Sequence, residues 1–245
     1  MSGAYTATAA LYNDFRGESP NMWAAYLDEL FEKYAGKKPK TLIDLACGTG
    51  TVTAALCRLG YDVTGVDISE EMLALAQKRA PGALLLHQDM RSLDLYGSYG
   101  GAVCCLDSVN YLPTEDDFRR TLSRLYNFLE PGSLFIFDVN TKRRFETKYG
   151  KNDFILESKN GLIAWSCDYR PRLKRCDFYL SCFIPDGDGK YIRRDEEQTE
   201  YVYTDEQIRR LAEETGYGVL AALDRISFQP ADENSDKVHY IFKRL

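Results

Sequence analysis

The spacing of the hydrophobic residues changes twice along the chain. Over residues 41–139, short apolar runs alternate with longer segments whose apolar residues recur every three or four positions. The first pattern is typical of buried strands and the second of amphipathic helices. Strands are expected at residues 41–46, 62–67, 84–87, 102–106 and 134–139. Strands that alternate with helices in this way predict an α/β fold with a parallel, doubly wound sheet.

Capping residues support the helices between these strands. Ser69 and Thr114 each stand directly before a helical pattern, where a hydroxyl can accept a hydrogen bond from a free backbone amide. A Pro-Gly pair ends each of these two helices. Before the first strand, the aromatic and leucine residues of segment 23–34 share one helical face, which predicts an amphipathic helix packed on the sheet.

A different pattern occupies residues 151–203. Turn signals at Asn160-Gly161, at Pro171 and over 186–189 separate runs rich in β-branched and aromatic residues. This spacing predicts an antiparallel β insertion of four strands built from hairpins. We expect the insertion to form a substrate lid on a core made of residues 1–150 and 204–245.

The core pattern then resumes. Thr204 and Gln207 have the spacing of a capping box and predict another helix. Two final strands are expected at residues 219–228 and 237–243.

The segment Asp44-Leu45-Ala46-Cys47-Gly48-Thr49-Gly50 leaves the first strand and begins a helix. Small residues there allow a sharp turn and a close approach of the backbone to a ligand. Asp67 ends the next strand, where its carboxylate can accept hydrogen bonds from both hydroxyls of a ribose. A dinucleotide loop would carry a third glycine, and an acid such as Asp44 would repel a pyrophosphate.

Composition narrows the choice of ligands. Lys and Arg number 31 against 37 Asp and Glu, and this net charge of −6 argues against nucleic acid and anionic membranes as partners. No apolar run approaches the ~20 residues of a membrane span, so a soluble, cytoplasmic protein is expected. With two histidines and no C-x-x-C pair, no metal site is expected.

Four ordered motifs carry a resemblance to a known family. They are the glycine segment 44–50, Val66–Leu73, Gln88–Arg91 and Cys105–Leu112. Together they resemble the cofactor motifs of class I S-adenosylmethionine-dependent methyltransferases, and most closely a bacterial small-molecule subgroup similar to sugar-amine N-methyltransferases. The resemblance covers essentially the whole chain and implies a seven-stranded Rossmann-like core, with Ala46 standing where many members have glycine.

The resemblance also implies which residues bind S-adenosylmethionine. Ala46, Gly48 and Gly50 would face the methionine and ribose portions, and Asp67 the ribose hydroxyls. The remaining cofactor contacts implied are Tyr12, Trp23, Asp44, Ile68, Met72, Asp89, Met90, Leu106 and Asp107. For two of these an alternative stays open: Trp23 fits the core stripe of its helix, and Asp107 can cap the turn that follows it.

Residues near the methyl group are expected to act on the substrate. Asn110 and Tyr111 would orient a lone pair by hydrogen bonding, while Glu197 of the lid would meet a cationic amine. Alternatively, Tyr111 only holds the N-terminal helix, and Glu197 guards an exposed sheet edge.

The expected function is therefore methyl transfer to a small molecule, with an amine as the first candidate and a monomer or weak homodimer as the assembly. A protein that binds S-adenosylmethionine without catalysis stays open as an alternative. A nicotinamide-dependent oxidoreductase stays open as well.

Overall fold

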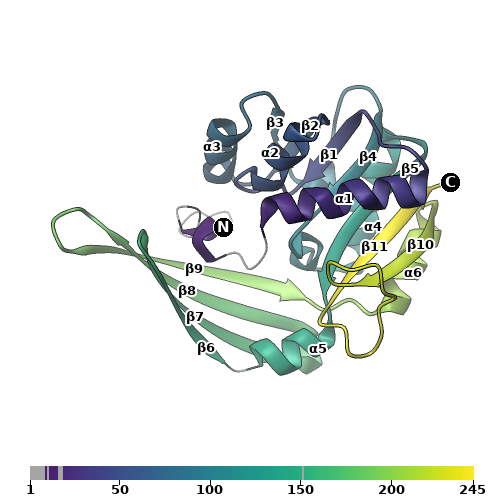
Figure 1. Cartoon of the computed structure of the whole chain (residues 1–245). Coiled ribbons are helices and arrows are strands. Elements are labelled where there is room, and N and C mark those ends of the chain that lie inside the picture. Colours follow the sequence, from purple (N-terminus) through teal and green to yellow (C-terminus); the bar gives the residue numbers. More distant parts are fainter. Residues whose placement is uncertain (1–8, 10, 16–18, 151) are drawn as a thin grey trace.

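A computed structural model describes residues 9, 11–15, 19–150 and 152–245. Seven strands form one sheet at its centre (Figure 1). They are β1 (Thr41–Leu45), β2 (Asp62–Asp67), β3 (Leu84–His87), β4 (Tyr99–Cys104), β5 (Leu129–Asn140), β10 (Tyr217–Asp224) and β11 (Lys237–Arg244). Their order across the sheet is β10-β11-β5-β4-β1-β2-β3. The strands from β5 to β3 are parallel, as the alternation of strands and helices predicts.

The sheet departs from the predicted parallel arrangement at β11. This strand is antiparallel to both β5 and β10, so the sheet is mixed. The physical reason is the connection, because residues 225–236 join β10 to β11 without a crossover helix. The boundaries also shift, since β4 begins at Tyr99 and β10 ends at Asp224.

Helices cover both faces of this sheet. On one face, α1 (Pro20–Ala35), α2 (Thr51–Arg58) and α3 (Glu70–Arg79) lie together, and α4 (Glu115–Phe128) and α6 (Asp205–Glu214) cover the other. The expected caps are present, because Ser69 and Thr114 accept bonds from Met72 N and Asp117 N. None of the helices in the described part of the chain is long and apolar enough to cross a membrane.

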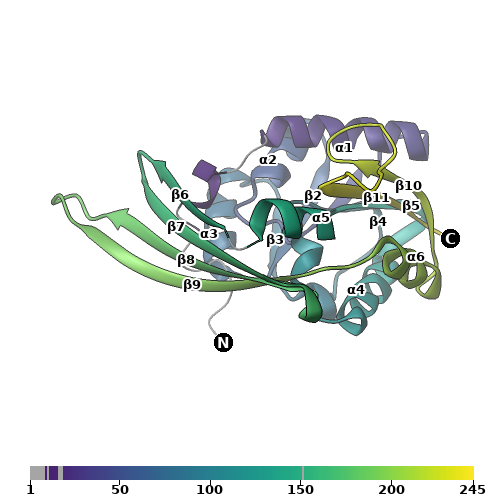
Figure 2. The same ribbon diagram turned by 90° about the horizontal axis from the view of Figure 1, so that it is seen from below.

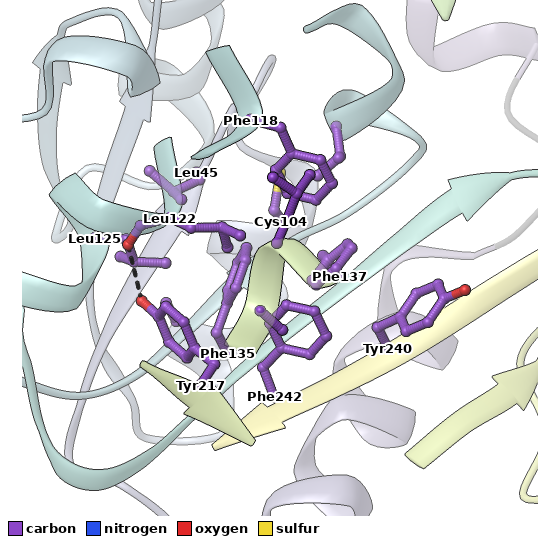
Figure 3. Packing of buried hydrophobic residues seen from close by; sticks show 14 of the residues in the cluster. Leu45, Cys104, Phe118, Leu122, Leu125, Phe135, Phe137, Tyr217, Tyr240 and Phe242 are labelled. Carbon is purple, nitrogen blue, oxygen red and sulfur yellow. Dashed lines mark hydrogen bonds between the residues drawn. The ribbon is translucent and has the colours of Figure 1, made fainter. Parts of the chain in front are cut away.

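The larger hydrophobic core lies between the sheet and helices α4 and α6 (Figure 3). Phe135 and Phe137 of β5 stack with ring centroids 4.9 Å apart, and Phe242 of β11 meets Phe137 edge-on at 4.9 Å. The Tyr217 hydroxyl donates to the Leu122 carbonyl at 3.1 Å, which gives this buried phenol its partner. This core fixes β11 beside β5.

A second sheet projects from the core (Figure 2). It consists of β6 (Asp153–Ser158), β7 (Gly161–Arg170), β8 (Arg175–Pro185) and β9 (Tyr191–Tyr201), all antiparallel in chain order. We call it the insertion sheet. The short helical segments α5 (Lys142–Arg144) and η4 (Phe145–Tyr149) connect β5 to it.

A short N-terminal helix, η1 (Tyr12–Phe15), lies between the two sheets. Asn13 accepts a hydrogen bond from the Thr49 hydroxyl at 2.8 Å, and Asp14 accepts one from the Ser158 hydroxyl at 2.8 Å. Leu11 is buried against the insertion sheet. The N-terminal segment thus joins the glycine turn of the core to the β6–β7 hairpin.

Candidate active site

The turn after β1 is built from residues in left-handed backbone conformations. Ala46, Gly48 and Gly50 have φ values of 55°, 55° and 70°. Left-handed backbone is free of strain for glycine but costs other residues roughly 1–2 kcal/mol. Ala46 therefore adopts a conformation that glycine would adopt more easily, which explains why glycine is common there in the family it resembles.

The two glycines of this turn have different surroundings. A Cβ atom added to Gly48 would meet nothing within 4 Å, whereas one added to Gly50 would lie 2.7 Å from the Cβ of Ala76. Gly48 thus borders open space, and Gly50 allows α2 to pack closely on α3. The resemblance implies a cofactor contact for both, but only Gly48 presents the open side that such a contact needs.

Asp67 closes one side of the turn. Its Oδ2 accepts from the Gly48 amide at 2.7 Å and its Oδ1 from the Ser69 amide at 2.9 Å. Burial raises the pKa of this carboxyl, and the hydrogen bonds from Ser69 and Gly48 partly offset the rise. Each carboxylate oxygen keeps a second acceptor position, so two further donors can bind.

A hollow lies over this turn and holds about 310 Å³ of space, part of it open to solvent. The turns that follow β1 and β4 and the start of α2 form its wall. The lining residues are Asp44, Ala46, Cys47, Gly48, Thr49, Thr51, Val52, Cys105, Leu106 and Ser108. Asp44 is buried and accepts from the Thr53 hydroxyl at 2.6 Å, which fixes its carboxylate.

The turn after β4 is also left-handed. Leu106 and Asp107 have φ values of 63° and 58°, and neither is glycine. The short helix η3 (Ser108–Tyr111) follows directly, and the backbone amide of Asn110 donates to the Asp107 carbonyl at 2.8 Å. This second turn faces the glycine turn across the hollow.

These residues fit the nucleoside part of S-adenosylmethionine. The free acceptor positions of Asp67 suit a ribose diol, the open side of Gly48 admits a ligand, and Ile68 beside them is 51% exposed. An exposed isoleucine at this position offers an apolar surface to one face of a purine. The glycine segment and Asp67, which we singled out from the sequence, are therefore brought together at one site.

The other residues expected to contact adenine bind or pack against other residues of the chain. Arg91 holds both carboxylate oxygens of Asp89, with Nε at 3.0 Å from Oδ1 and 2.9 Å from Oδ2. Burial alone would raise the pKa of Asp89, but the bonds from Arg91 outweigh it and lower that pKa. Met72 is buried, and Met90 is partly buried against the larger core.

Two expected cofactor contacts lie in the N-terminal part of the chain. Trp23 is buried against His239, with ring centroids 5.1 Å apart, and is absent from the lining of the hollow. The structure thus realises the alternative that Trp23 belongs to the core stripe of its helix. The backbone of Tyr12 belongs to η1, but its side chain is outside the described residues.

Asn110 departs from its expected role. Its side-chain nitrogen Nδ2 donates to the backbone carbonyl of Asn140 at 3.2 Å and to that of Tyr201 at 2.9 Å. Its Oδ1 accepts from the backbone amide of Asn140 at 2.8 Å. Both of its hydrogens are used, and the side chain is fully buried. Asn110 therefore joins β5 to the end of β9 and has no hydrogen left to orient a substrate.

Tyr111 contacts the insertion sheet. Its hydroxyl donates to Oε1 of Gln198 on β9 at 3.0 Å, and the amide nitrogen of Gln198 donates to Glu196. These bonds place β9 across the carboxyl ends of β4 and β5, the edge at which open α/β sheets bind ligands.

The face of β9 that meets the core is the opposite of the expected one. Glu197 is exposed beside Tyr179, while Glu196, Gln198 and Glu200 point inward. The reason is register: Gln198 pairs with the buried Phe178 of β8, and paired residues share a face. Glu197 therefore points away from the core, contrary to its expected direction, and its neighbours on either side point toward the core.

Glu200 is the most deeply buried acid of this inner face. Its Oε2 accepts from the side-chain nitrogen Nδ2 of Asn140 at 2.7 Å. Burial, and next the nearby Asp107 carboxylate, raise the pKa of Glu200 to about 8. An acid that is neutral near physiological pH thus lies at the junction of the two sheets.

An ion cluster at the same edge was not anticipated from the sequence. Lys237, at the start of β11, lies 2.5 Å from Asp107 Oδ1 and 2.7 Å from Asp138 Oδ2. Asp138 and Asn140 are buried polar residues at the carboxyl end of β5. That position, which singled out Asp67 on β2, is the signal that could have found them.

Neither histidine lines the hollow. His87 is exposed, with Nε2 2.9 Å from the Ile68 carbonyl, and His239 is buried between aromatic rings. Within the described part of the chain, no group of three or more His, Cys, Asp or Glu side chains could hold a metal ion.

Comparisons with known proteins agree with this geometry. The family described as "Methyltransferase domain" matches residues 42–132. A candidate methyltransferase of Geobacillus sp. (strain WCH70) is 29% identical over 98% of this chain and 99% of its own length. The dTDP-3-amino-3,4,6-trideoxy-alpha-D-glucopyranose N,N-dimethyltransferase of Streptomyces venezuelae is 31% identical over 47% of this chain and 50% of its own.

A solved structure extends the similarity to the whole fold. The crystal structure of an S-adenosylmethionine-dependent methyltransferase from Clostridium acetobutylicum ATCC 824 matches with a TM-score of 0.87 and 27% identity. The match covers 98% of each chain, so it includes the insertion sheet as well as the core.

Proposed function

This chain is a class I S-adenosylmethionine-dependent methyltransferase, and we propose that its acceptor is the nitrogen of a small amine. The amine would bind between the turn after β4 and the inner face of β9. We call this face, made of Glu196, Gln198 and Glu200, the inner acidic face. The insertion sheet would then serve as the lid over the reacting groups.

The observation that carries the proposal is the direction of the inner acidic face. Two carboxyl groups and one amide of β9 point toward Tyr111 and Asn140 at the carboxyl ends of the core strands. Carboxylates attract an ammonium ion during binding, and aromatic rings add cation–π contacts. An anionic carboxylate substrate would be repelled by the Glu196 carboxylate.

The chemistry asks little acid–base work of the protein. When bound, S-adenosylmethionine supplies a methyl group that its positively charged sulfur has already activated. The residues of this chain must hold a neutral amine with its lone pair aimed at that methyl and must exclude water. Hydrogen-bond acceptors suffice for this task, which agrees with the positions of His87 and His239 outside the hollow.

Two residues have the geometry for this positioning. The Tyr111 hydroxyl donates to Gln198 at 3.0 Å, and this bond fixes the direction of the hydroxyl. The ionised form of Glu200 would accept a proton from a charged amine, because the raised pKa of Glu200, about 8, lies near that of many small amines. The likeness to the Streptomyces N,N-dimethyltransferase supports an amino group as the acceptor.

A methyl-transfer screen tests the proposal. The protein is incubated with S-adenosylmethionine labelled in the methyl group and with matched sets of amines, carboxylic acids and phenols. We expect label in N-methylated products and an equal amount of S-adenosylhomocysteine. Turnover confined to the acids or phenols would refute the amine, and cofactor binding without turnover on any set would indicate a binding protein.

A further inference from the structure

Lys237 is a buried ammonium group that the proposed chemistry does not use. Its side chain is 7% exposed, and its Nζ lies between the carboxylates of Asp107 and Asp138 at 2.5 and 2.7 Å. Asp138 Oδ2 also accepts from the Asp107 amide at 2.9 Å. One lysine and one aspartate therefore hold both the side chain and the backbone of Asp107.

The segment that they hold is strained. Leu106 and Asp107 are consecutive residues with positive φ, and such conformations persist only where the surroundings impose them. Leu106 lines the hollow over the glycine turn. Whatever fixes this dipeptide therefore fixes one wall of the cofactor site.

The charges of the cluster explain why a lysine is needed. Two carboxylates buried side by side repel each other, and an ammonium between them removes most of that repulsion. Burial alone would lower the pKa of Lys237, but Asp107 and Asp138 outweigh it and raise that pKa. Lys237 thus stays charged, and burial of Asp107 is likewise outweighed by Lys237, which leaves the pKa of Asp107 lowered.

The topology says which end of the cofactor this wall contacts. Asp67, suited to the ribose, ends β2 on one side of β1, whereas the Leu106–Asp107 turn follows β4 on the other side. A ligand whose ribose binds Asp67 extends its amino-acid part across the glycine turn toward β4. The turn that Lys237 holds is therefore the wall of the amino-acid end.

We propose that Lys237 is a positioning residue that holds the Leu106–Asp107 turn in shape for the amino-acid part of S-adenosylmethionine. It acts through Asp107 and Asp138 and does not touch the ligand. This role concerns the cofactor only and is independent of the acceptor.

Two ligands that differ only at the amino-acid end test this role. S-Adenosylhomocysteine carries that end, and 5′-methylthioadenosine has the same nucleoside and sulfur without it. Calorimetry on Lys237→Met should show the dissociation constant of S-adenosylhomocysteine raised at least tenfold and that of 5′-methylthioadenosine changed less than twofold. Lys243→Met, on the same strand but in its half-exposed part, should change neither.

An equal loss of affinity for both ligands would reduce Lys237 to a general structural role, and no loss would remove it from the site. If Lys237→Met does not fold, the same two ligands are measured on Asp138→Asn instead. That variant keeps the Lys237–Asp107 pair but loses the ion pair that anchors the turn to β5, and we expect the same selective loss, about threefold or more. Neither ligand carries a methyl donor group, so a failed acceptor screen would leave this result unaffected.

Discussion

The two sheets of this protein contribute to the site in different ways. The core sheet supplies backbone turns, in which Gly48, Leu106 and Asp67 are fixed by strand ends and by short hydrogen bonds. The insertion sheet supplies side chains from one face of a strand, and these meet the core through few bonds, such as Tyr111 to Gln198. A backbone turn depends on conformational strain and packing, whereas a strand face depends on register.

This difference predicts different consequences of substitution. Changes in the turns of the core should cost stability and cofactor affinity, because the same atoms shape the fold and the hollow. Changes on the inner acidic face should alter the pH dependence and the rate of reaction while leaving the cofactor bound. The four predictions below test this division, beginning with the largest effect.

Substitution of Gly50 should have the largest effect. In Gly50→Ala the new Cβ would lie 2.7 Å from Ala76 Cβ and 2.9 Å from its Cα at a φ of 70°. Overpacking and left-handed strain together should lower the free energy of unfolding by roughly 2–5 kcal/mol. Gly48→Ala is the matched control, since it carries the strain without the clash and should cost only about 1–2 kcal/mol. Equal losses in urea titrations of the two variants would contradict the close packing of α2 on α3.

Glu200 should make stability depend on pH. Its folded pKa, about 8, lies above the ordinary value of 4.5, so between these values the native state holds a proton that the unfolded chain has lost. The contribution of Glu200 to stability is therefore greatest at low pH and is lost as pH rises through 8, by roughly 3 kcal/mol between pH 6 and 9. Glu200→Gln, which keeps a partner for Asn140, should lose most of this slope. An unchanged slope, measured by denaturant titration at each pH, would show that Glu200 ionises normally.

Asp67 should affect the cofactor more than the fold. Asp67→Ala removes the acceptors for a ribose diol and should weaken S-adenosylhomocysteine binding by roughly 1–3 kcal/mol, or about 5- to 150-fold. Asp62→Ala, at the exposed start of the same strand, serves as the control and should bind normally. Calorimetry that finds wild-type affinity in Asp67→Ala would remove Asp67 from the site.

The Tyr111 hydroxyl should have the smallest effect, on rate alone. Tyr111→Phe loses one positioning bond, worth about 1 kcal/mol, and should slow single-turnover methyl transfer roughly five- to tenfold. Cofactor affinity should stay nearly intact. Glu197→Gln, on the outer face of β9, should change neither quantity. A normal rate with weakened cofactor binding in Tyr111→Phe would reject the positioning role and leave the tyrosine a structural one.

Periodicity and motifs were sufficient for most of the fold. The alternation of apolar runs predicted the core strands, and polar residues at strand ends pointed to Asp67 because parallel strands bring their carboxyl ends to one edge. The turn signals at Asn160-Gly161 and 186–189 predicted the hairpins of the insertion sheet. The resemblance of four motifs to class I methyltransferases then indicated the cofactor.

The parts that could not be predicted depend on contacts between distant residues. The inner face of β9 is fixed by its pairing with β8, and a shift of one residue exchanges Glu197 for Glu196 and Gln198. Lys237 meets Asp107 across 130 positions of sequence, so no local pattern relates them. Asn110 lies in one of the four motifs that resemble those of methyltransferases, yet its side-chain amide forms hydrogen bonds with the backbone of Asn140.

The position of β11 has a consequence for how the protein is made. In the sequence it follows the other strands of the core sheet, yet it lies inside the sheet, between β5 and β10 (Figure 1). A nascent chain that ends before Lys237 leaves the Phe135 and Phe137 rings without Phe242 and leaves Asp107 without its ammonium partner. Hydrophobic burial and the shape of the cofactor wall thus both depend on β11. Chains stalled before β11 should therefore be unable to capture cofactor.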